Sequence, residues 1–256
     1  MTSPTEKAQN FASLHKVGDP LILFNAWDPG SAKIVAGAGA KAIATGSWSV
    51  AAAFGYEDGE ALPRDLAIEN IARIARAVDL PVSIDLEGGY GDAPDAVAES
   101  AALAIEAGAI GCNFEDRRVG SDGLHSIEEQ VKRIAAIRAA SDAVGVPFFI
   151  NARTDYFLQS KPEEHAAHIE AALERGRAYA EAGANGLFVP GLGDEQLIAA
   201  ICAESPIPVN IMVWTNTPPL KRLAELGVAR ISHAGAPWAL AMEALAEASR
   251  GVYSPG

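Results

Sequence analysis

Cysteine is nearly absent from this chain of 256 residues, which contains only Cys112 and Cys202. Two cysteines cannot build the disulfide framework of a small secreted protein. The first seven residues, MTSPTEK, lack both the basic start and the apolar centre of a signal peptide. We therefore expect a cytoplasmic protein whose cysteines are not cross-linked.

Positive charge is also scarce, since 33 acidic residues outnumber 20 basic ones and give a formal net charge of −13. The basic residues form no run, so we expect no nucleic-acid partner and no anionic membrane surface. Long apolar runs are missing too, and none approaches the roughly 20 residues that span a bilayer. Small molecules are the expected partners.

Short apolar runs alternate with alanine-rich amphipathic stretches along the chain, without a linker or a break in composition. This pattern predicts a single domain over residues 1–256, of the α/β class, folded as a closed (β/α)₈ TIM-type barrel. An extra helix at Glu6–His15 precedes the first strand. The predicted strands, each followed by a helix, are Leu21–Ala26, Ala42–Gly46, Val82–Leu86, Ile110–Glu115, Phe148–Arg153, Gly186–Pro190, Val209–Val213 and Ala229–His233.

Polar residues gather where these strands end, which is where barrels of this kind carry their chemistry. Asp85 and Glu87 lie two residues apart after the third strand, so in extended backbone their carboxylates point to one side. Two such acids are costly unless a positive group joins them, and a divalent cation is the simplest partner. Alternatively, both acids lie in a solvated loop and cap the next helix.

Glu115 ends the fourth strand and Arg153 the fifth, which places them at the same mouth as the first two acids. A set of oxygen ligands, Asp85, Glu87 and Glu115, favours a hard ion, Mg²⁺ or Mn²⁺. The sequence therefore predicts a magnesium or manganese site with one arginine beside it.

The residues that two other kinds of barrel enzyme require do not occur at the expected positions. No lysine lies at the end of a predicted strand, which argues against a Schiff-base aldolase. The five histidines are scattered, and the close pair His165 and His168 falls on a polar predicted helix, where a solvated face is the simpler interpretation. Zinc is therefore disfavoured.

Five motifs together resemble the isocitrate lyase/phosphoenolpyruvate mutase superfamily, over about residues 24–236. They are Asn25–Asp28, Thr45–Ser47 with Asp58 shortly after, Asp85–Gly91, Asn113–Asp116 and Asn151–Asp155. The resemblance implies a (β/α)₈ barrel that holds Mg²⁺ and binds the 2-oxo acid part of a substrate. An enolate then forms when a neighbouring bond breaks. Members of the superfamily split C–C bonds, rearrange or hydrolyse C–P bonds, or decarboxylate oxaloacetate.

The resemblance also implies residue roles. Asp85 matches the direct metal ligand, and Glu87, Glu115 and Asp58 match acids that hold the ion mostly through its waters. Arg153 matches the arginine that faces the bound carboxylate or enolate. We therefore expect Arg153, Asp58 and Glu115 to be catalytic, with Asp85, Glu87 and Glu115 at the metal.

Substrate contacts are expected from a second set of residues. The turn Thr45-Gly46-Ser47 matches the carboxylate-binding turn of the family, with glycine where a serine is usual, so that Ser47 would serve from one position later. Backbone N–H groups and hydroxyls at such a turn can bind a carboxylate. Trp48 is the candidate wall of the pocket, and Asn210, on the seventh strand, is the remaining candidate beside Arg153.

Two departures from the family pattern bear on the activity. Glu87 stands where aspartate is usual, and its extra methylene decides between direct contact and contact through water. The loop Arg117–His125 is short and has no Lys-Lys/Arg-Cys-Gly-His motif, so isocitrate and methylisocitrate cleavage are not favoured. A mutase reaction, which needs a sealed site, is doubtful.

These observations predict a Mg²⁺-dependent lyase that acts on a small 2-oxo or 2-hydroxy dicarboxylate through an enolate. C–C cleavage and decarboxylation of the oxaloacetate type both remain open. The alternatives are a phosphonopyruvate-type hydrolase or mutase, and a 2-oxo acid binding protein with weak turnover.

The last predicted helix, Trp238–Val252, carries an apolar stripe that includes Met242 and Leu245. In the resembled family this helix is commonly exchanged between barrels, so we expect a homodimer or homotetramer. Otherwise the helix packs on its own barrel, with Tyr253 closing the seam.

Overall fold

Eight strands alternate with helices over residues 2–253, the part of the chain that the computed structural model describes. Met1 and residues 254–256, the ends of the predicted domain, lie outside this part. The strands are β1 (Leu21–Leu23), β2 (Ile43–Ala44), β3 (Val82–Asp85), β4 (Gly111–Glu115), β5 (Phe149–Arg153), β6 (Gly186–Phe188), β7 (Val209–Met212) and β8 (Arg230–Ser232).

The helices lie before and between the strands, and one follows the last strand. They are α1 (Pro4–Ser13), α2 (Pro29–Gly37), α3 (Ser47–Phe54), α4 (Arg64–Ala77), α5 (Pro94–Glu106), α6 (Ile127–Ala143), the 3₁₀ turn η1 (Pro162–Glu164), α7 (His165–Glu181), α8 (Glu195–Glu204), α9 (Leu220–Glu225) and α10 (Ala236–Tyr253).

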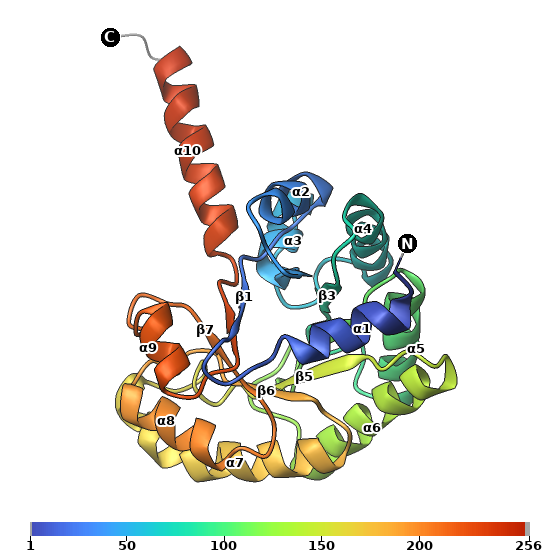
Figure 1. Ribbon diagram of the computed structural model, residues 1–256, viewed down its shortest axis with the longest axis vertical. Coiled ribbons are helices and arrows are strands. Elements are labelled where there is room, and N and C mark those ends of the chain that lie inside the picture. Colours follow the sequence, from blue (N-terminus) through green and yellow to red (C-terminus); the bar gives the residue numbers. More distant parts are fainter. Residues whose placement is uncertain (1, 254–256) are drawn as a thin grey trace.

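The strands form one parallel sheet in the order β1-β8-β7-β6-β5-β4-β3-β2. A parallel bridge between Ala26 and Thr45, just beyond β1 and β2, closes the sheet into a ring. Helices surround this ring, as Figure 1 shows. The predicted (β/α)₈ barrel with an extra N-terminal helix is confirmed.

Local signals explain where several helices start. Asp28 is the N-cap of α2, and its carboxylate accepts a hydrogen bond from Ser31 N at 2.7 Å, with proline at the first helical position. Ser126 begins α6 through a capping box with Glu129. Helix α3 was missed by sequence reasoning, because no side chain caps it and Gly46 stands at its N-cap.

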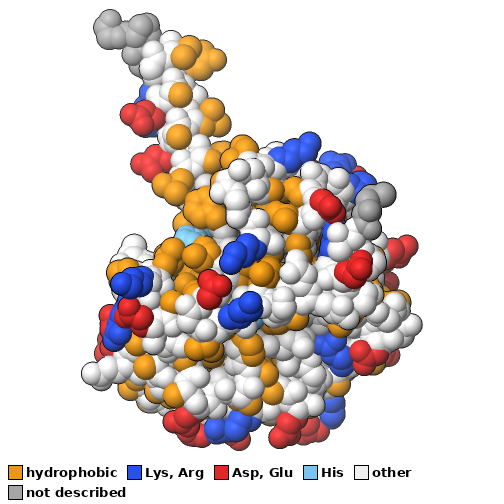
Figure 2. Space-filling view, in the orientation of Figure 1, with side chains coloured by type: hydrophobic (Ala, Val, Ile, Leu, Met, Phe, Trp, Pro, Cys, Tyr) orange, Lys and Arg blue, Asp and Glu red, His pale blue; other side chains and the backbone are white. Residues whose placement is uncertain are grey.

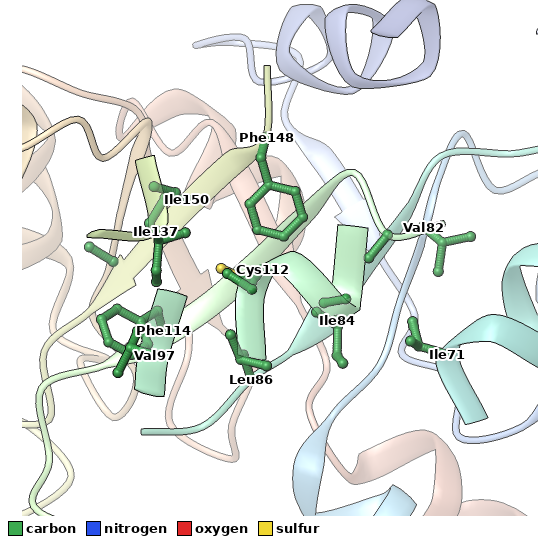
Figure 3. Packing of buried hydrophobic residues seen from close by; sticks show 14 of the residues in the cluster. Ile71, Val82, Ile84, Leu86, Val97, Cys112, Phe114, Ile137, Phe148 and Ile150 are labelled. Atoms are coloured by element: carbon green, nitrogen blue, oxygen red, sulfur yellow. The ribbon is translucent and has the colours of Figure 1, made fainter. Parts of the chain in front are cut away.

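The largest apolar cluster lies between the outer faces of β2–β5 and the helices that cover them. Figure 3 shows Ile84, Cys112 and Ile150 from three neighbouring strands packing with Phe148 and with Ile137 of α6. Cys112 is fully buried there as a small apolar residue, as expected. Since all carbonyl ends of the strands point one way, this packing holds the site-bearing edge in a fixed geometry.

Helix α10 departs from the barrel instead of covering it (Figure 1). Pro237 is its only buried residue, whereas Leu240 and Leu245 are each 59% exposed. Ile22 and Phe24, in and just after β1, are also exposed. Only the first turn packs on its own barrel, where Trp238 meets the Trp27 ring edge-on at 5.2 Å, and the described remainder of α10 does not cover the barrel. No helix of the described chain is both long and apolar enough to cross a membrane.

Candidate active site

Asp85 stands at the exit of β3, at the centre of the barrel mouth. Its Oδ2 accepts a hydrogen bond from the backbone N–H of Ser47 at 2.9 Å. Its Oδ1 is buried and has no hydrogen-bond partner among the described residues. A buried carboxylate oxygen left without a donor is the kind of atom that a cation satisfies.

The turn Thr45-Gly46-Ser47 leads into α3, so the backbone N–H groups at the start of this helix face the site. Thr45 Oγ1 accepts from Asp85 N at 2.9 Å, which ties the end of β2 to the end of β3. A helix N-terminus favours negative charge, so this turn can hold a carboxylate in addition to Asp85.

Glu87 lies two residues beyond Asp85 but turns toward a neighbouring loop. Its Oε2 accepts from Gly59 N at 2.9 Å and from Glu60 N at 2.7 Å. Its Oε1 accepts a long hydrogen bond from Tyr90 Oη, at 3.5 Å. The backbone of Glu87 has φ +51°, a left-handed conformation that costs a non-glycine residue about 1–3 kcal/mol.

Glu115 and Arg153 lie side by side because β4 and β5 pair in register at these residues. Arg153 Nη1 contacts Glu115 Oε2 at 2.9 Å. The other edge of the guanidinium meets Asp155, with Nε 2.5 Å from Oδ1 and Nη2 2.9 Å from Oδ2. This two-pronged contact fixes the plane of Arg153 and leaves one N–H on each terminal nitrogen for a ligand.

Asp155 is itself held by a buried support behind the site. Its backbone N–H donates to Asp116 Oδ1 at 3.1 Å, and Asp116 Oδ2 accepts from Arg175 at 3.0 Å and Tyr179 at 2.8 Å. Asp116 therefore does not face the mouth, and Arg175, rather than Arg117 or Arg153, is its partner. Sequence reasoning missed Arg175 and Tyr179, although their spacing of four residues on one helix is a detectable signal.

The acids at the mouth outnumber the one arginine among them, and their pKa values reflect this. Burial, followed by the charge on Asp85, raises the pKa of Glu87 to about 8. Burial also raises the pKa of Glu115 to about 8, against the lowering effect of Arg153. Burial raises the pKa of Asp85, and the negative charge of Asp58 adds to that rise.

The donor set fits a hard divalent cation. The candidate ligands are all carboxylates, Asp85 Oδ1 is unsatisfied, and burial raises the pKa values of Asp85 and Glu87, which a bound cation would counter. Within residues 2–253, however, no three acid, histidine or cysteine groups are already close enough together to hold an ion. This suits Mg²⁺, which is commonly bound by one or two carboxylates and keeps several waters.

A cavity of about 10 Å³ next to Asp85 and Glu87, lined also by Thr45 and Ser47, has room for about one such water. Asp58 is exposed on the loop above, where its charge affects Asp85 and Glu87. The structure thus gathers Thr45, Gly46, Ser47, Asp58, Asp85, Glu87, Glu115 and Arg153 at one end of the barrel.

Asn210 is placed apart from this group. It is fully buried, its Oδ1 accepts from Asn151 at 3.0 Å, and its Nδ2 donates to Ile211 O at 2.9 Å. Arg230, 1% exposed, joins the same layer through Asn113 Oδ1 at 2.9 Å. This polar layer fills the middle of the barrel below the mouth, so Asn210 supports the site from beneath.

Trp48, the candidate wall of the pocket, and two other polar or aromatic side chains can be placed relative to the acids. Trp48 is 47% exposed, and its ring lies so close to Gly235 that a side chain there would collide with it, which suits a pocket wall. His233 is held by Leu23 O at 3.1 Å and contacts the Phe24 ring, away from the acids. Arg118 pairs with Glu129 at 2.6 Å and does not reach the mouth.

Fold and site together define a class of protein: a parallel barrel whose mouth combines an acid cluster, a fixed arginine and a helix N-terminus, as enzymes that stabilise oxyanions do. The sequence model of the phosphoenolpyruvate phosphomutase family matches residues 11–253, and the chain belongs to this family, within the isocitrate lyase/phosphoenolpyruvate mutase superfamily of lyases and mutases.

Similar proteins support this membership. The crystal structure of a candidate phosphonomutase from Burkholderia cenocepacia is 54% identical, with a TM-score of 0.95, and the match covers 97% of this chain and 99% of that one. An uncharacterized protein of Mycobacterium tuberculosis is 35% identical over 95% of this chain and 88% of its own length. A 2-methylisocitrate lyase of Escherichia coli is 31% identical over 92% and 79%.

Proposed function

We propose that this protein is a Mg²⁺-dependent lyase that cleaves a small 2-oxo or 2-hydroxy dicarboxylate through an enolate. Two features at the same mouth carry the proposal. One is the Asp85 oxygen that has no hydrogen-bond partner, and the other is the guanidinium of Arg153, which keeps free N–H groups. A cation and a fixed guanidinium on either side of one oxygen lower the energy of an oxyanion.

The chain's own residues bind and orient the substrate. N–H groups at the start of α3 donate hydrogen bonds to the substrate carboxylate, and Arg153 donates to the 2-oxo oxygen as its charge develops. Asp85 would hold Mg²⁺ directly, and Glu115, Asp58 and Glu87 would hold its waters. When bound, the ion supplies Lewis-acid stabilisation of that oxygen.

The loop after β4 bears on which bond is broken. Arg117 and Leu124 pair across it, and its Arg118 is tied to Glu129 of α6, so the loop forms a compact turn beside the barrel. A mouth without a long covering loop suits decarboxylation or C–C cleavage better than a phosphoryl rearrangement, whose intermediate must be kept from water. Oxaloacetate decarboxylases are among the 31% identical relatives.

A substrate panel tests the proposal. Oxaloacetate, 2-methylisocitrate and phosphonopyruvate, the compounds in the names of similar proteins, are incubated with Mg²⁺ or with EDTA. Release of pyruvate, carbon dioxide and phosphate is followed against a no-enzyme control. We expect Mg²⁺-dependent pyruvate release from a dicarboxylate. Phosphate release from phosphonopyruvate alone would support C–P hydrolysis instead, and binding of oxalate without any turnover would support a binding protein.

We also propose that α10 docks on a second copy of this chain. Its exposed Leu240 and Leu245 face no partner in their own barrel, and Ile22 and Phe24 are left uncovered beside β1, where an eighth surrounding helix would lie. Figure 2 shows apolar side chains along α10 and on the barrel near its base. Exposed apolar surface on both elements fits exchange of the helix between two barrels.

Truncation before Pro237 tests this assembly. Exchange predicts that light scattering finds a monomer or an unfolded chain, because each barrel then loses the helix that covers β1 of its neighbour. A truncated protein that keeps the oligomeric mass of the full chain would contradict exchange.

A further inference from the structure

We propose that Glu60 and Glu87 form a reciprocal clasp that positions the loop bearing Asp58, and that Glu60 is a positioning residue of the site. The loop at residues 57–60 and the loop at residues 86–91 each supply one carboxylate to the backbone of the other. Glu87 Oε2 accepts from Gly59 N at 2.9 Å and from Glu60 N at 2.7 Å. Glu60 Oε1 accepts in return from Tyr90 N at 2.8 Å.

The backbone at both ends of the clasp is held in an uncommon conformation. Glu60 has φ +61°, Glu87 has φ +51° and Tyr90 has φ +58°, all left-handed values at residues other than glycine. Such conformations persist where the surrounding contacts enforce them, and they gather at functional sites. Here the three hydrogen bonds of the clasp join the two loops, and Arg133 also holds the loop at residues 86–91 by donating to Gly88 O and Gly91 O.

Asp58 depends on this arrangement because it directly precedes Gly59. Its side chain is exposed and makes no hydrogen bond or ion pair among residues 2–253, so nothing else on its own side chain fixes it. Its negative charge is one of the causes that raise the pKa values of Asp85 and Glu87, after burial as the main cause. The N–H groups immediately after it, anchored on Glu87, fix the backbone from which its side chain projects.

The length of Glu87 has a structural reason in this clasp. An aspartate at this position would be one methylene shorter and would not reach both N–H groups of the neighbouring loop in the present geometry. Glu87 thus commits Oε2 to the loop and keeps Oε1 for a water of the cation, while Asp58 would be presented to the cation from the loop that Glu87 holds. This assignment rests on the proposed function, since it gives the clasp a metal-site role.

Hydrogen exchange measures the clasp itself, without any metal or substrate. In Glu60→Ala we expect the amide of Tyr90 to exchange at least tenfold faster, together with those of Gly59 and of residue 60. Glu60→Gln keeps an acceptor oxygen, so its exchange should stay within about threefold of the parent. Glu57→Ala, on the same loop but exposed and without a side-chain hydrogen bond or ion pair in the described chain, is the matched control. Unchanged exchange in Glu60→Ala would overturn the clasp.

Mn²⁺ binding, followed by electron paramagnetic resonance in the absence of substrate, measures the role at the site. We expect about tenfold weaker binding in Glu60→Ala, or about 1.4 kcal/mol, with recovery in Glu60→Gln and no change in Glu57→Ala. Faster exchange combined with parental Mn²⁺ affinity would overturn the positioning role. Should Glu60→Ala fail to fold, Glu87→Asp shortens the same clasp and must show the same two changes.

If the proposed metal-dependent function is wrong, the result differs from the one expected if the clasp is wrong. A parent protein that binds no Mn²⁺ contradicts the metal-dependent lyase and, with it, the positioning of Asp58 toward a cation. The exchange experiment still decides whether the two carboxylates hold the loops together.

Discussion

The two ends of the barrel are built on opposite principles. At the bottom, α1 closes the ring with Phe11, which is fully buried and packs edge-on against Phe149 at 5.4 Å, while His15 stacks on Phe149 at 4.0 Å. At the mouth, mutually repelling acids surround Arg153, and the neighbouring loops adopt strained backbone conformations. Stability therefore resides at the bottom and chemistry at the mouth.

The middle layer separates these ends. Arg230 lies between them, hydrogen-bonded to Asn113, and the charge of Asp85 above it favours its protonated form against the cost of burial. Apolar groups below and a polar network above meet at this layer, and Arg230 contacts both, since its guanidinium lies 5.8 Å from the centre of the Phe11 ring. The comparison is thus open to direct tests.

The largest effect is expected for Asp85→Asn at the mouth. The amide cannot replace the charge that the unsatisfied Oδ1 offers to a cation, so metal-dependent kcat/KM should fall about 1,000-fold, or about 4 kcal/mol. Thermal unfolding should stay at or above the parent temperature, because an acid leaves a repelling cluster. Steady-state kinetics and calorimetry check both points, with exposed Asp122→Asn as control. Retention of more than about a tenth of kcat/KM would remove Asp85 as the direct ligand.

Phe11→Ala tests the bottom. Removal of this buried ring should lower the free energy of unfolding by about 3–5 kcal/mol, while kcat per folded molecule stays within about twofold. Urea unfolding gives the free energy of unfolding, and the kinetics are recorded 20 °C below the midpoint of thermal unfolding of the variant. Val17→Ala, at a 73% exposed residue nearby, is the control. A stable variant that has lost its activity would show that the two ends are coupled.

Arg153→Lys should lower kcat/KM about 100-fold, or about 2.7 kcal/mol. A lysine ammonium cannot reproduce the two-pronged contact with Asp155 and still donate to Glu115 and a substrate. Kinetics over a range of pH, with exposed Arg117→Lys as control, measure the change. If rate and pH profile both match the parent, Arg153 has only a structural role.

The smallest effect concerns pH, and the two ends should respond with opposite sign. Burial lowers the pKa of His15 to about 3, so between pH 6.5 and 3 the unfolded chain binds a proton that the folded chain does not. Acidification from pH 7 to 5 should therefore cost about 2 kcal/mol at this residue. Glu87 and Glu115 have raised pKa values, so the folded state holds extra protons between pH 4.5 and 8 and gains stability on acidification.

The variant His15→Leu isolates the contribution of the bottom. The free energy of unfolding of parent and variant is measured in metal-free buffer at pH 7 and at pH 5. The decrease from pH 7 to pH 5 should be about 2 kcal/mol smaller in the variant than in the parent. Equal pH dependence in parent and variant would mean that His15 is protonated in the folded state as readily as in the unfolded one.

Most of the fold could be predicted because its signals are local. The apolar runs that became β3, β4 and β5 are bounded by turn residues, and the structure places these three strands within one residue of their predicted bounds. Helix α3 was missed because its eight residues carry no side-chain cap and too little polar alternation to mark a buried face.

The sequence by itself determined the barrel, its family and the acids and arginine that follow β3, β4 and β5, since strand order in such a barrel brings these strand ends together. Tertiary structure alone decided what each polar group meets. Asp116 turns away to Arg175, Asn210 is sealed in the middle layer, and Glu60 reaches Tyr90 thirty residues away. A hydrogen bond depends on distances of tenths of an ångström and on direction, and residue spacing along the chain does not specify either between separate loops.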